Sequence, residues 1–422
     1  MSGWSAIEQA AKETDFDALL KHVRVLRHFN YDRICKNRTG NFYGGIAERL
    51  FDRNGDFRND SAEKLFFAAN KAFDIETRNY SDFSGSASSG ALRLLGAARS
   101  GSETLLLFRN RGGRTLAMGF LRDDGTCPAL HETPVKDDMF DGKDDIIARR
   151  SGPVAFDGDS VVIADTAGTL HVFDRRSATW TSIGEAAPAP VTSITLGFRR
   201  IWMLCGGFTH KAPFSAMISC AFDGSDRQTH FSTARAARRN ELDGMKIIWL
   251  DSLTVVGRSL FFIVTGDQTA IFRYSPESGE FSRVVTFPFS GSYIDRLWEQ
   301  DGALYCFTYG HGERIYRIDP AAKKAEWLFN QTGGRYKFDA PDARPATMRG
   351  GSQMNLPWIF KDGMLYSANY TPGVIDLADP KASPLLLLPG CAYVFDAGDA
   401  VLYLGGSRCF FVRKKGGTPV EP

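Results

Sequence analysis

The stretch LHVFDRRSATWTSI, residues 170–183, indicates how this chain folds. An alternating apolar run ends at Phe173 and Asp174, polar and small residues follow, and a second run starts at Trp180. This arrangement predicts two antiparallel strands joined by a turn. We expect Asp174 to end the first strand by binding backbone amides of the turn, and Trp180 to restart the second strand as an apolar anchor.

The same pattern recurs further along the chain. The copies are IFRYSPESGEFSRVV (271–285), IYRIDPAAKKAEWLF (315–329) and the looser ISCAFDGSDRQTHF (218–231). In the first two copies the anchors are Phe281 and Trp327, and Asp319 takes the place of Asp174. Recurrence of one hairpin along a chain of this length indicates a repeat architecture.

A second recurring unit precedes the hairpins and consists of an apolar residue, a glycine turn and a dense apolar run. Its glycines are Gly158, Gly257, Gly302, Gly363 and Gly398. A glycine supplies the positive φ of a tight hairpin turn, and a dense run predicts a strand buried on both faces. The dense runs start near residues 104, 160, 199, 259, 303, 364 and 400, which predicts seven units of four strands.

Seven four-stranded units predict an all-β fold, a seven-bladed β-propeller, because one such blade cannot bury its faces alone. A pair of β-sandwiches is the alternative, and the regular recurrence of the glycine turn argues against it. The last unit begins at Cys391 and lacks an outermost strand. We expect that strand to come from near residues 74–95.

Three segments carry features of a known repeat. IWMLCGG (201–207) and VLYLGG (401–406) end in a glycine doublet, and LHVFDRRSATW (170–180) carries an aromatic residue followed by a Trp. Together they resemble the kelch type of propeller repeat, over residues 91–415. No blade holds every feature, because the blade with the best hairpin has ADTAG (164–168) in place of the doublet. The resemblance therefore concerns the superfamily.

Before the propeller, the apolar spacing becomes helical. A first helix is expected to bury one face and to be capped by Asp15, a second to lie around residues 46–50, and a third to span 61–73. The face of the first consists of Phe16, Leu19, Leu20, Val23 and Leu26, and that of the third of Leu65, Phe66, Ala69 and Phe73. We expect a helical segment at 1–80, a Ser/Gly-rich linker at 81–90, the propeller at 91–415 and a tail at 416–422.

The composition excludes several classes of protein. Lys and Arg number 51 and Asp and Glu 49, so no overall field attracts nucleic acid or a membrane surface. We see no apolar run of signal-peptide or membrane-spanning length and expect a cytoplasmic protein. The seven cysteines form no C-x-x-C pair, and Cys205, Cys220, Cys306 and Cys409 lie in apolar runs, where we expect them to be buried.

One segment resembles a metal-binding loop. In DRNGDFRNDSAE (52–63), oxygen-bearing side chains fall at the ligand positions of an EF-hand, but Phe57 and Asn59 replace the usual glycine and aliphatic residue. Asp60 and Glu63 are explained equally well as a capping box for the following helix. We therefore predict no metal and no cofactor.

The candidate binding residues lie in loops that a propeller would gather on one face, around the mouth of its channel. These loops follow the second strand of a blade or join one blade to the next, and they are locally basic. The candidates are Arg109, Arg111, Arg114, His210, Lys211, Arg235, Arg238, Arg239, His311, Arg314 and Arg349. His171, by contrast, is expected at the surface or edge of an outer strand.

Two functions fit this pattern. The first is a protein-interaction scaffold, part of a hetero-complex, whose basic face binds an acidic protein segment. The alternative is an enzyme, a lyase or hydrolase, or a binding protein for an anionic small molecule such as an acidic sugar. No nucleophile elbow, phosphate loop or dinucleotide fingerprint supports an enzyme, and membranes and nucleic acids are not expected partners.

Overall fold

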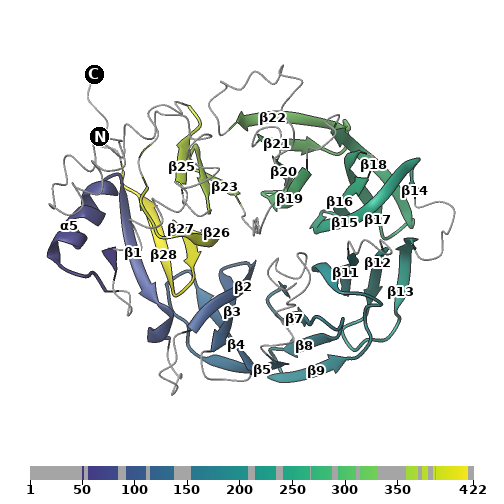
Figure 1. The fold of residues 1–422 in the computed structure, drawn as a ribbon, viewed down its shortest axis with the longest axis horizontal. Coiled ribbons are helices and arrows are strands. Elements are labelled where there is room, and N and C mark those ends of the chain that lie inside the picture. The colour runs from purple at the N-terminus through teal and green to yellow at the C-terminus, as the bar shows by residue number, and fades with distance from the viewer. Residues whose placement is uncertain are drawn as a thin grey trace, which may run out of the picture. The chain divides into compact units, whose positions relative to one another are not determined.

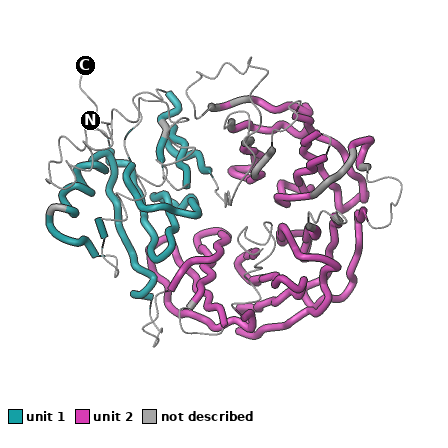
Figure 2. The backbone as a smooth tube through the Cα atoms, viewed as in Figure 1, with its two compact units in different colours: residues 1–83, 356–422 teal, residues 84–355 magenta. Residues whose placement is uncertain are grey.

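The protein is represented by a computed structural model, which describes residues 50–51, 56–83, 92–110, 115–136, 154–207, 214–233, 241–266, 268–287, 293–309, 314–330, 358–368, 373–378, 384 and 386–416. These residues form seven antiparallel sheets, one α-helix and one short 3-10 helix (Figure 1). The predicted all-β fold, a seven-bladed β-propeller, is confirmed. The chain divides into two compact units, unit 1 (Met1–Phe83 and Leu356–Pro422) and unit 2 (Ser84–Asn355) (Figure 2).

Unit 2 contains blades 1 to 5, and in each blade strands that follow one another in sequence are hydrogen-bonded neighbours. Blade 1 is β2 (Leu92–Ser100), β3 (Glu103–Asn110), β4 (Thr115–Arg122) and β5 (Leu130–Lys136). Blade 2 is β6 (Val154–Phe156), β7 (Ser160–Ala164), β8 (Leu170–Asp174) and β9 (Thr179–Ile183). Blade 3 is β10 (Val191–Gly197), β11 (Arg200–Gly207), β12 (Phe214–Cys220) and β13 (Gln228–Ser232). The four strands of blade 4 are β15 (Met245–Val256), β16 (Ser259–Gly266), β17 (Thr269–Ser275) and β18 (Glu280–Phe287), and the two-residue β14 (Glu241–Leu242) pairs with the start of β15 and is not counted among them. Blade 5 is β19 (Tyr293–Gln300), β20 (Ala303–Tyr309), β21 (Arg314–Asp319) and β22 (Lys324–Asn330).

Unit 1 contains the last two blades. The described strands of blade 6 are β23 (Trp358–Lys361), β24 (Met364–Ser367) and β25 (Gly373–Asp376). Blade 7 consists of β26 (Cys391–Ala397), β27 (Ala400–Gly405), β28 (Arg408–Lys414) and, outermost, β1 (Phe73–Asn79). β1 pairs with β28 from Phe73↔Lys414 to Asn79↔Arg408, so the strand missing from the end of the chain comes from the region that the sequence indicates.

The second strands of the blades begin where the dense apolar runs predict them. They start at residues 103, 160, 200, 259, 303, 364 and 400. All five glycines predicted in these turns have a positive φ, which is 100° at Gly158, 57° at Gly257, 76° at Gly302, 72° at Gly363 and 68° at Gly398. The glycine turn and the buried strand are both local features, which is why the sequence locates them to within a residue.

The turns between third and fourth strands follow the pattern of residues 170–183. Asp174 Oδ1 accepts hydrogen bonds from the backbone amides of Arg176 (2.8 Å) and Ser177 (3.4 Å). Asp319 Oδ1 accepts from Ala321 and Ala322, both at 2.9 Å. The side chain thus ends its strand by occupying the amides that would otherwise extend it, as predicted.

The anchor residues of the fourth strands reach the preceding blade. Trp180 lies opposite Phe173 with ring centroids 5.0 Å apart, and its Nε1–H donates to the carbonyl of Glu132 on β5 at 3.2 Å. Phe281 lies 4.6 Å from Tyr274 of its own blade and 6.2 Å from Phe231 on β13. Each anchor therefore fixes an outer strand to two blades at once.

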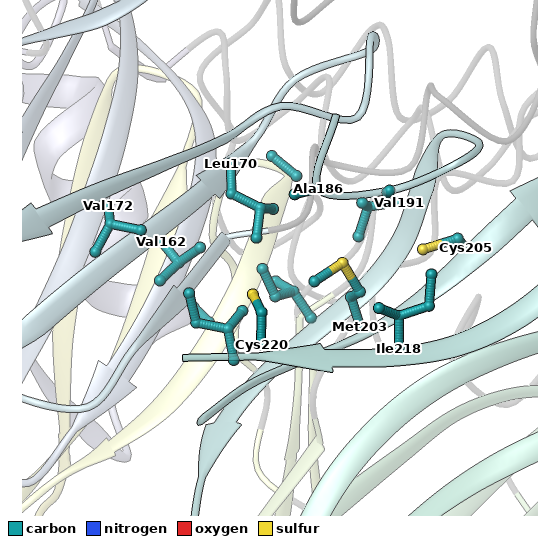
Figure 3. Close-up of a cluster of buried hydrophobic side chains, with 14 of the residues drawn as sticks. Val162, Leu170, Val172, Ala186, Val191, Met203, Cys205, Ile218 and Cys220 are labelled. Atoms are coloured by element: carbon teal, nitrogen blue, oxygen red, sulfur yellow. The ribbon is translucent and has the colours of Figure 1, made fainter. Parts of the chain in front are cut away.

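The core of unit 2 lies between blades. Between blades 2 and 3, side chains from β7 and β8 face others from β11 and β12 (Figure 3). Val162 and Leu170 from one side and Met203 and Ile218 from the other are each at most 1 % exposed. Because adjacent blades of unit 2 bury their facing side chains against each other, removal of a large core side chain there costs about 2–5 kcal/mol.

The innermost strands are joined by serine hydroxyls. Successive inner strands of unit 2 lie side by side, and β10, β15 and β19 all contain irregular pairing of the kind caused by a β-bulge. Ser193 Oγ on β10 accepts from the amide of Leu253 on β15 at 2.9 Å. Ser252 Oγ on β15 accepts from the amide of Leu297 on β19 at 2.7 Å. Backbone amides of two inner strands thus bind the neighbouring blade, and that of Leu253 lies within the irregular stretch of β15.

The described helix, α5 (Asp60–Ala69), is shorter than expected. Its N-cap is Asn59, whose side chain accepts from the amide of Ala62, so the predicted capping box of Asp60 and Glu63 is wrong by one residue. Leu65, Phe66 and Ala69 are buried as predicted, but the helix ends at Ala69 and Phe73 begins β1. The helices expected at 15–26 and 46–50, and residues 52–55 of the calcium-like loop, lie outside the described residues or at their margin.

Candidate functional site

Two of the eleven candidate binding residues, Arg109 and Arg314, lie in the described part of the chain. The other nine, Arg111, Arg114, His210, Lys211, Arg235, Arg238, Arg239, His311 and Arg349, lie outside it. Their role in binding therefore stays a prediction. What the structure supplies is the position of the strands on either side of these residues.

Arg109 and Arg314 occupy matching places in blades 1 and 5. Arg109 lies near the end of β3, opposite Leu116 of β4, and Arg314 begins β21, opposite Thr308 of β20. Both therefore flank the connection from a second to a third strand. Because the strands of a blade run alternately up and down in sequence order, this connection leaves from the same end of the sheet as the connection to the next blade. We call this end of the blades of unit 2 the loop end.

A first hydrogen-bonded histidine lies in blade 2. His171 Nδ1 is 3.0 Å from Ser182 Oγ on β9, and its Nε2 is 3.4 Å from Asp165 Oδ2 in the turn before β8. His171 is 7 % exposed, so the expectation that it lies at the surface is wrong. The other carboxylate oxygen, Asp165 Oδ1, accepts from the amides of Ala167 and Thr169 at 2.9 Å each. The imidazole is therefore enclosed between a turn and an outer strand.

The order carboxylate, imidazole and hydroxyl is also that of a hydrolytic triad. Ser182, however, lies in the middle of β9, directly opposite His171, and not in a loop at a strand end where a substrate pocket is usually built. Asp165 holds its own turn while it binds the ring. The arrangement accounts for the stability of this corner of blade 2, and we assign it no catalytic role.

A second histidine joins blades 3 and 4. His230 of β13 has its Nε2 2.8 Å from Ser219 Oγ on β12 and its Nδ1 2.8 Å from the hydroxyl of Tyr274 on β17. Arg200 Nε donates to the same Ser219 Oγ at 3.0 Å. Because Ser219 accepts from the guanidinium, its own hydrogen is available for Nε2, and Nδ1–H can then donate to Tyr274. A neutral imidazole satisfies every partner in this chain of hydrogen bonds.

Aromatic rings and a positive charge surround His230. Its ring lies 4.8 Å from that of Trp202, with an interplanar angle of 30°, and 5.1 Å from that of Tyr274. Burial, and secondarily the charge of Arg200, lower the pKa of His230 from 6.5 to about 4. The imidazole is therefore uncharged at neutral pH. Arg200 itself is paired with Asp226.

The sequence contains one signal for the special position of His230. His230 falls in the loose copy of the hairpin, near the place that Trp180 and Phe281 occupy in blades 2 and 4. An aromatic ring that can hydrogen-bond thus stands where the other blades have an apolar anchor. The pairing of β12 with β13 shifts between Met217 and Ile218, so simple alternation does not predict its partners.

Two further features bear on function. Among the described residues, no three His, Cys, Asp or Glu side chains are grouped so as to hold a metal ion. The part of the chain that the structure describes includes no helix long and apolar enough to cross a membrane. The six described cysteines, among them Cys205, Cys220, Cys306 and Cys409, are buried and form no disulfide with one another.

The fold places the protein in the class of seven-bladed β-propellers. Its sequence matches no protein-family profile and no curated protein. Solved structures similar to it include YCF48 bound to a D1 peptide, with 12 % sequence identity, a TM-score of 0.46 and coverage of 80 % of this chain and 96 % of that one. A chain of a nidogen–laminin complex has 13 % identity and a TM-score of 0.40, with coverage of 69 % of this chain and 100 % of that one. A puromycin hydrolase is similar over 79 % of this chain and 55 % of its own, with 15 % sequence identity and a TM-score of 0.49. Similarity at this level carries no information on partner or activity.

Proposed function

We propose that the protein is an interaction scaffold whose loop end in unit 2 binds an acidic segment of a partner protein. The observation that carries this proposal is the strand order of the blades. In this order the second and last strands of each blade of unit 2 end at the loop end, and we expect the candidate arginines in the connections that follow them. Arg109 and Arg314, at the margins of two such connections, are the described members of this set.

The chemistry of arginine suits such a role. A guanidinium grips a carboxylate with two parallel hydrogen bonds, whereas a single exposed ion pair contributes only about 0.2–1 kcal/mol. Useful affinity therefore needs several arginines that act together. We further propose that the protein works in the cytoplasm within a hetero-complex and that its repeats are kelch-like. The seven scattered cysteines, which show no spacing typical of a disulfide framework, support the compartment, and the glycine doublets support the subtype.

The test uses a fluorescein-labelled peptide of alternating Glu and Ser residues as a probe. We expect the full-length protein to bind it, with an affinity that falls as salt concentration rises. Replacing Arg235, Arg238 and Arg239 together by Ala, or Arg109, Arg111 and Arg114 together, should weaken binding far more than any single replacement. A matched control replaces Arg176, Lys323 and Lys324, exposed basic residues in or next to the turns between third and fourth strands, and should leave binding unchanged.

Two results would overturn the proposal. One is a peptide affinity that is insensitive to salt and to both triple replacements. The other is binding of an acidic oligosaccharide, such as polygalacturonate, in preference to the peptide, which would assign the loop end to an anionic small molecule. Circular dichroism of each variant, compared with the unchanged protein, verifies that the β-structure is retained.

A further inference from the structure

The hairpin between β10 and β11 in blade 3 has an unusual tip. Both of its turn residues, Phe198 and Arg199, have left-handed backbones, with φ of 56° and 58°. The corresponding tip of blade 5 is Asp301–Gly302, a pair that adopts this conformation readily. For bulky residues such as Phe and Arg it is strained. Blade 3 thus departs from the less strained solution that blade 5 uses.

The strained tip is held from below by Trp202. The Nε1–H of Trp202 donates to the carbonyl of Gly197 at 3.1 Å, next to the turn, and its ring meets that of Phe198 edge-on at 6.3 Å. Trp202 is itself 1 % exposed, between His230 and Tyr274. Phe198, by contrast, is 39 % exposed. A rigid support therefore presents an aromatic ring to the solvent.

The tip of blade 4 lies beside it. A Cβ added to Gly197 would come within 3.0 Å of Val255 Cγ2, so the two inner hairpins approach closely. The tip of the blade 4 hairpin contains Arg258, which is exposed, as is Arg199. Among the described residues neither guanidinium has an ion-pair partner. Phe198, Arg199 and Arg258 together are called the tip patch.

The positive charge of the tip patch is confined to two blades. In unit 2 the tip of blade 2 carries Asp157 and Asp159 and the tip of blade 5 carries Asp301, all exposed. A long polyanion such as nucleic acid would have to pass these carboxylates, which disfavours it. A short segment with one or two carboxylates fits between them.

We infer that the tip patch is a docking site for a short acidic segment of a partner protein that carries a large apolar side chain. Carboxylates of the segment pair with Arg199 and Arg258, and its apolar side chain packs on Phe198. Exposed aromatic and arginine side chains on a rigid base are the residues that dominate binding energy in protein interfaces. The strain at Phe198 and Arg199 is then the consequence of a binding role. This site lies at the opposite end of the sheets from the loop end and is independent of it.

The experiment selects displayed random peptides on the full-length protein and compares it with two variants. The first, Phe198→Asn with Arg199→Gly, installs a favoured turn pair, and the second is Arg258→Glu. We expect peptides that combine Asp or Glu with Leu, Phe or Trp, and a loss of affinity of about thirtyfold or more in the first variant, as for a binding hot spot. The same variant should melt at a higher temperature, because its turn is no longer strained.

The controls separate this site from the loop end. Arg317→Glu makes the same charge change at an exposed position in blade 5 and should leave peptide binding intact. The triple replacement of Arg235, Arg238 and Arg239 should also leave it intact. The inference is overturned if no peptide distinguishes the native chain from the variant with Phe198→Asn and Arg199→Gly, or if the distinguishing peptides lack acidic residues. It is also overturned if the native chain binds a labelled single-stranded RNA and the same variants lose that binding.

Discussion

Blades 2 and 3 fasten their outermost strands by different chemistry. In blade 2, Trp180 packs against Phe173 and donates to a carbonyl of the preceding blade. In blade 3, His230 is held by hydrogen bonds to Ser219 and Tyr274. An indole does not titrate, whereas burial and the charge of Arg200 oppose protonation of the imidazole. The residue that holds the outermost strand thus determines whether the stability of a blade depends on acid.

The largest effect is expected when the support of His230 is removed. Trp202 is 1 % exposed and contacts His230, Tyr274 and the tip of blade 3. Trp202→Ala should lower the free energy of unfolding by about 3–5 kcal/mol, measured by urea denaturation. Trp202→Phe retains a ring for His230 and should lose clearly less. Equal losses in the two variants would mean that the contact with His230 is unimportant.

The anchor of blade 2 is only partly buried, so its removal should cost less. Trp180→Ala is expected to lower the free energy of unfolding by about 1–2 kcal/mol, because it loses apolar contact with Phe173 and the hydrogen bond to Glu132. Trp180→Phe isolates the hydrogen bond and should lose about 0.5–1.5 kcal/mol. If Trp180→Ala left the free energy of unfolding unchanged, the stability of blade 2 would not depend on its anchor.

The pH dependence of stability should distinguish the two blades. An unfolded chain takes up a proton on this imidazole near pH 6.5 and the folded chain only near pH 4, so between these values acid favours unfolding. The contribution of His230 is fully present above about pH 6.5 and is lost as the pH falls toward 4. The melting temperature of the native chain should therefore fall more steeply over this range than that of His230→Gln. Trp180→Phe should keep the native slope, and equal slopes in all three proteins would contradict the prediction.

The smallest effect is expected at the turn caps. Backbone amides of Arg176 and Ser177 bind Asp174 and lower the pKa of its carboxyl group, so the stabilisation is present above its ordinary pKa and is lost in strong acid. Asp174→Ala should lower the melting temperature at neutral pH by less than Trp180→Ala does. Asp174→Asn keeps an acceptor oxygen and should recover most of the loss. If Asp174→Ala lowered the melting temperature more than Trp180→Ala does, the turn cap would contribute more to stability than the anchor, contrary to this prediction.

The sequence predicted those parts of the fold that depend on local chemistry. The glycine turns and dense runs place every second strand to within a residue, and Asp174 and Asp319 cap their turns as expected. The blade 3 hairpin lacks the glycine that marks the other tips, so the strain at Phe198 and Arg199 could not be inferred from that pattern.

The surroundings of the histidines depend on contacts between strands and between blades. Alternation alone does not say what covers a side chain, and the ring of His171 is covered by the turn at Asp165. His230 meets Tyr274 of the next blade, a contact between residues far apart in the chain. For the loop end, sequence and strand order agree on which connections share it. Affinity there depends on how several arginines converge, which a sequence does not specify.

The pairing of β1 with β28 has a consequence for folding during synthesis on the ribosome. β1 ends at Asn79, and the residue opposite it, Arg408, is made much later. At a synthesis rate of about 5–20 residues per second, the wait on the ribosome is roughly 16 to 66 s. Throughout this time an edge strand has no partner and can attract other nascent chains. The seventh blade is thus the last to form, and a stalled ribosome leaves its first strand exposed.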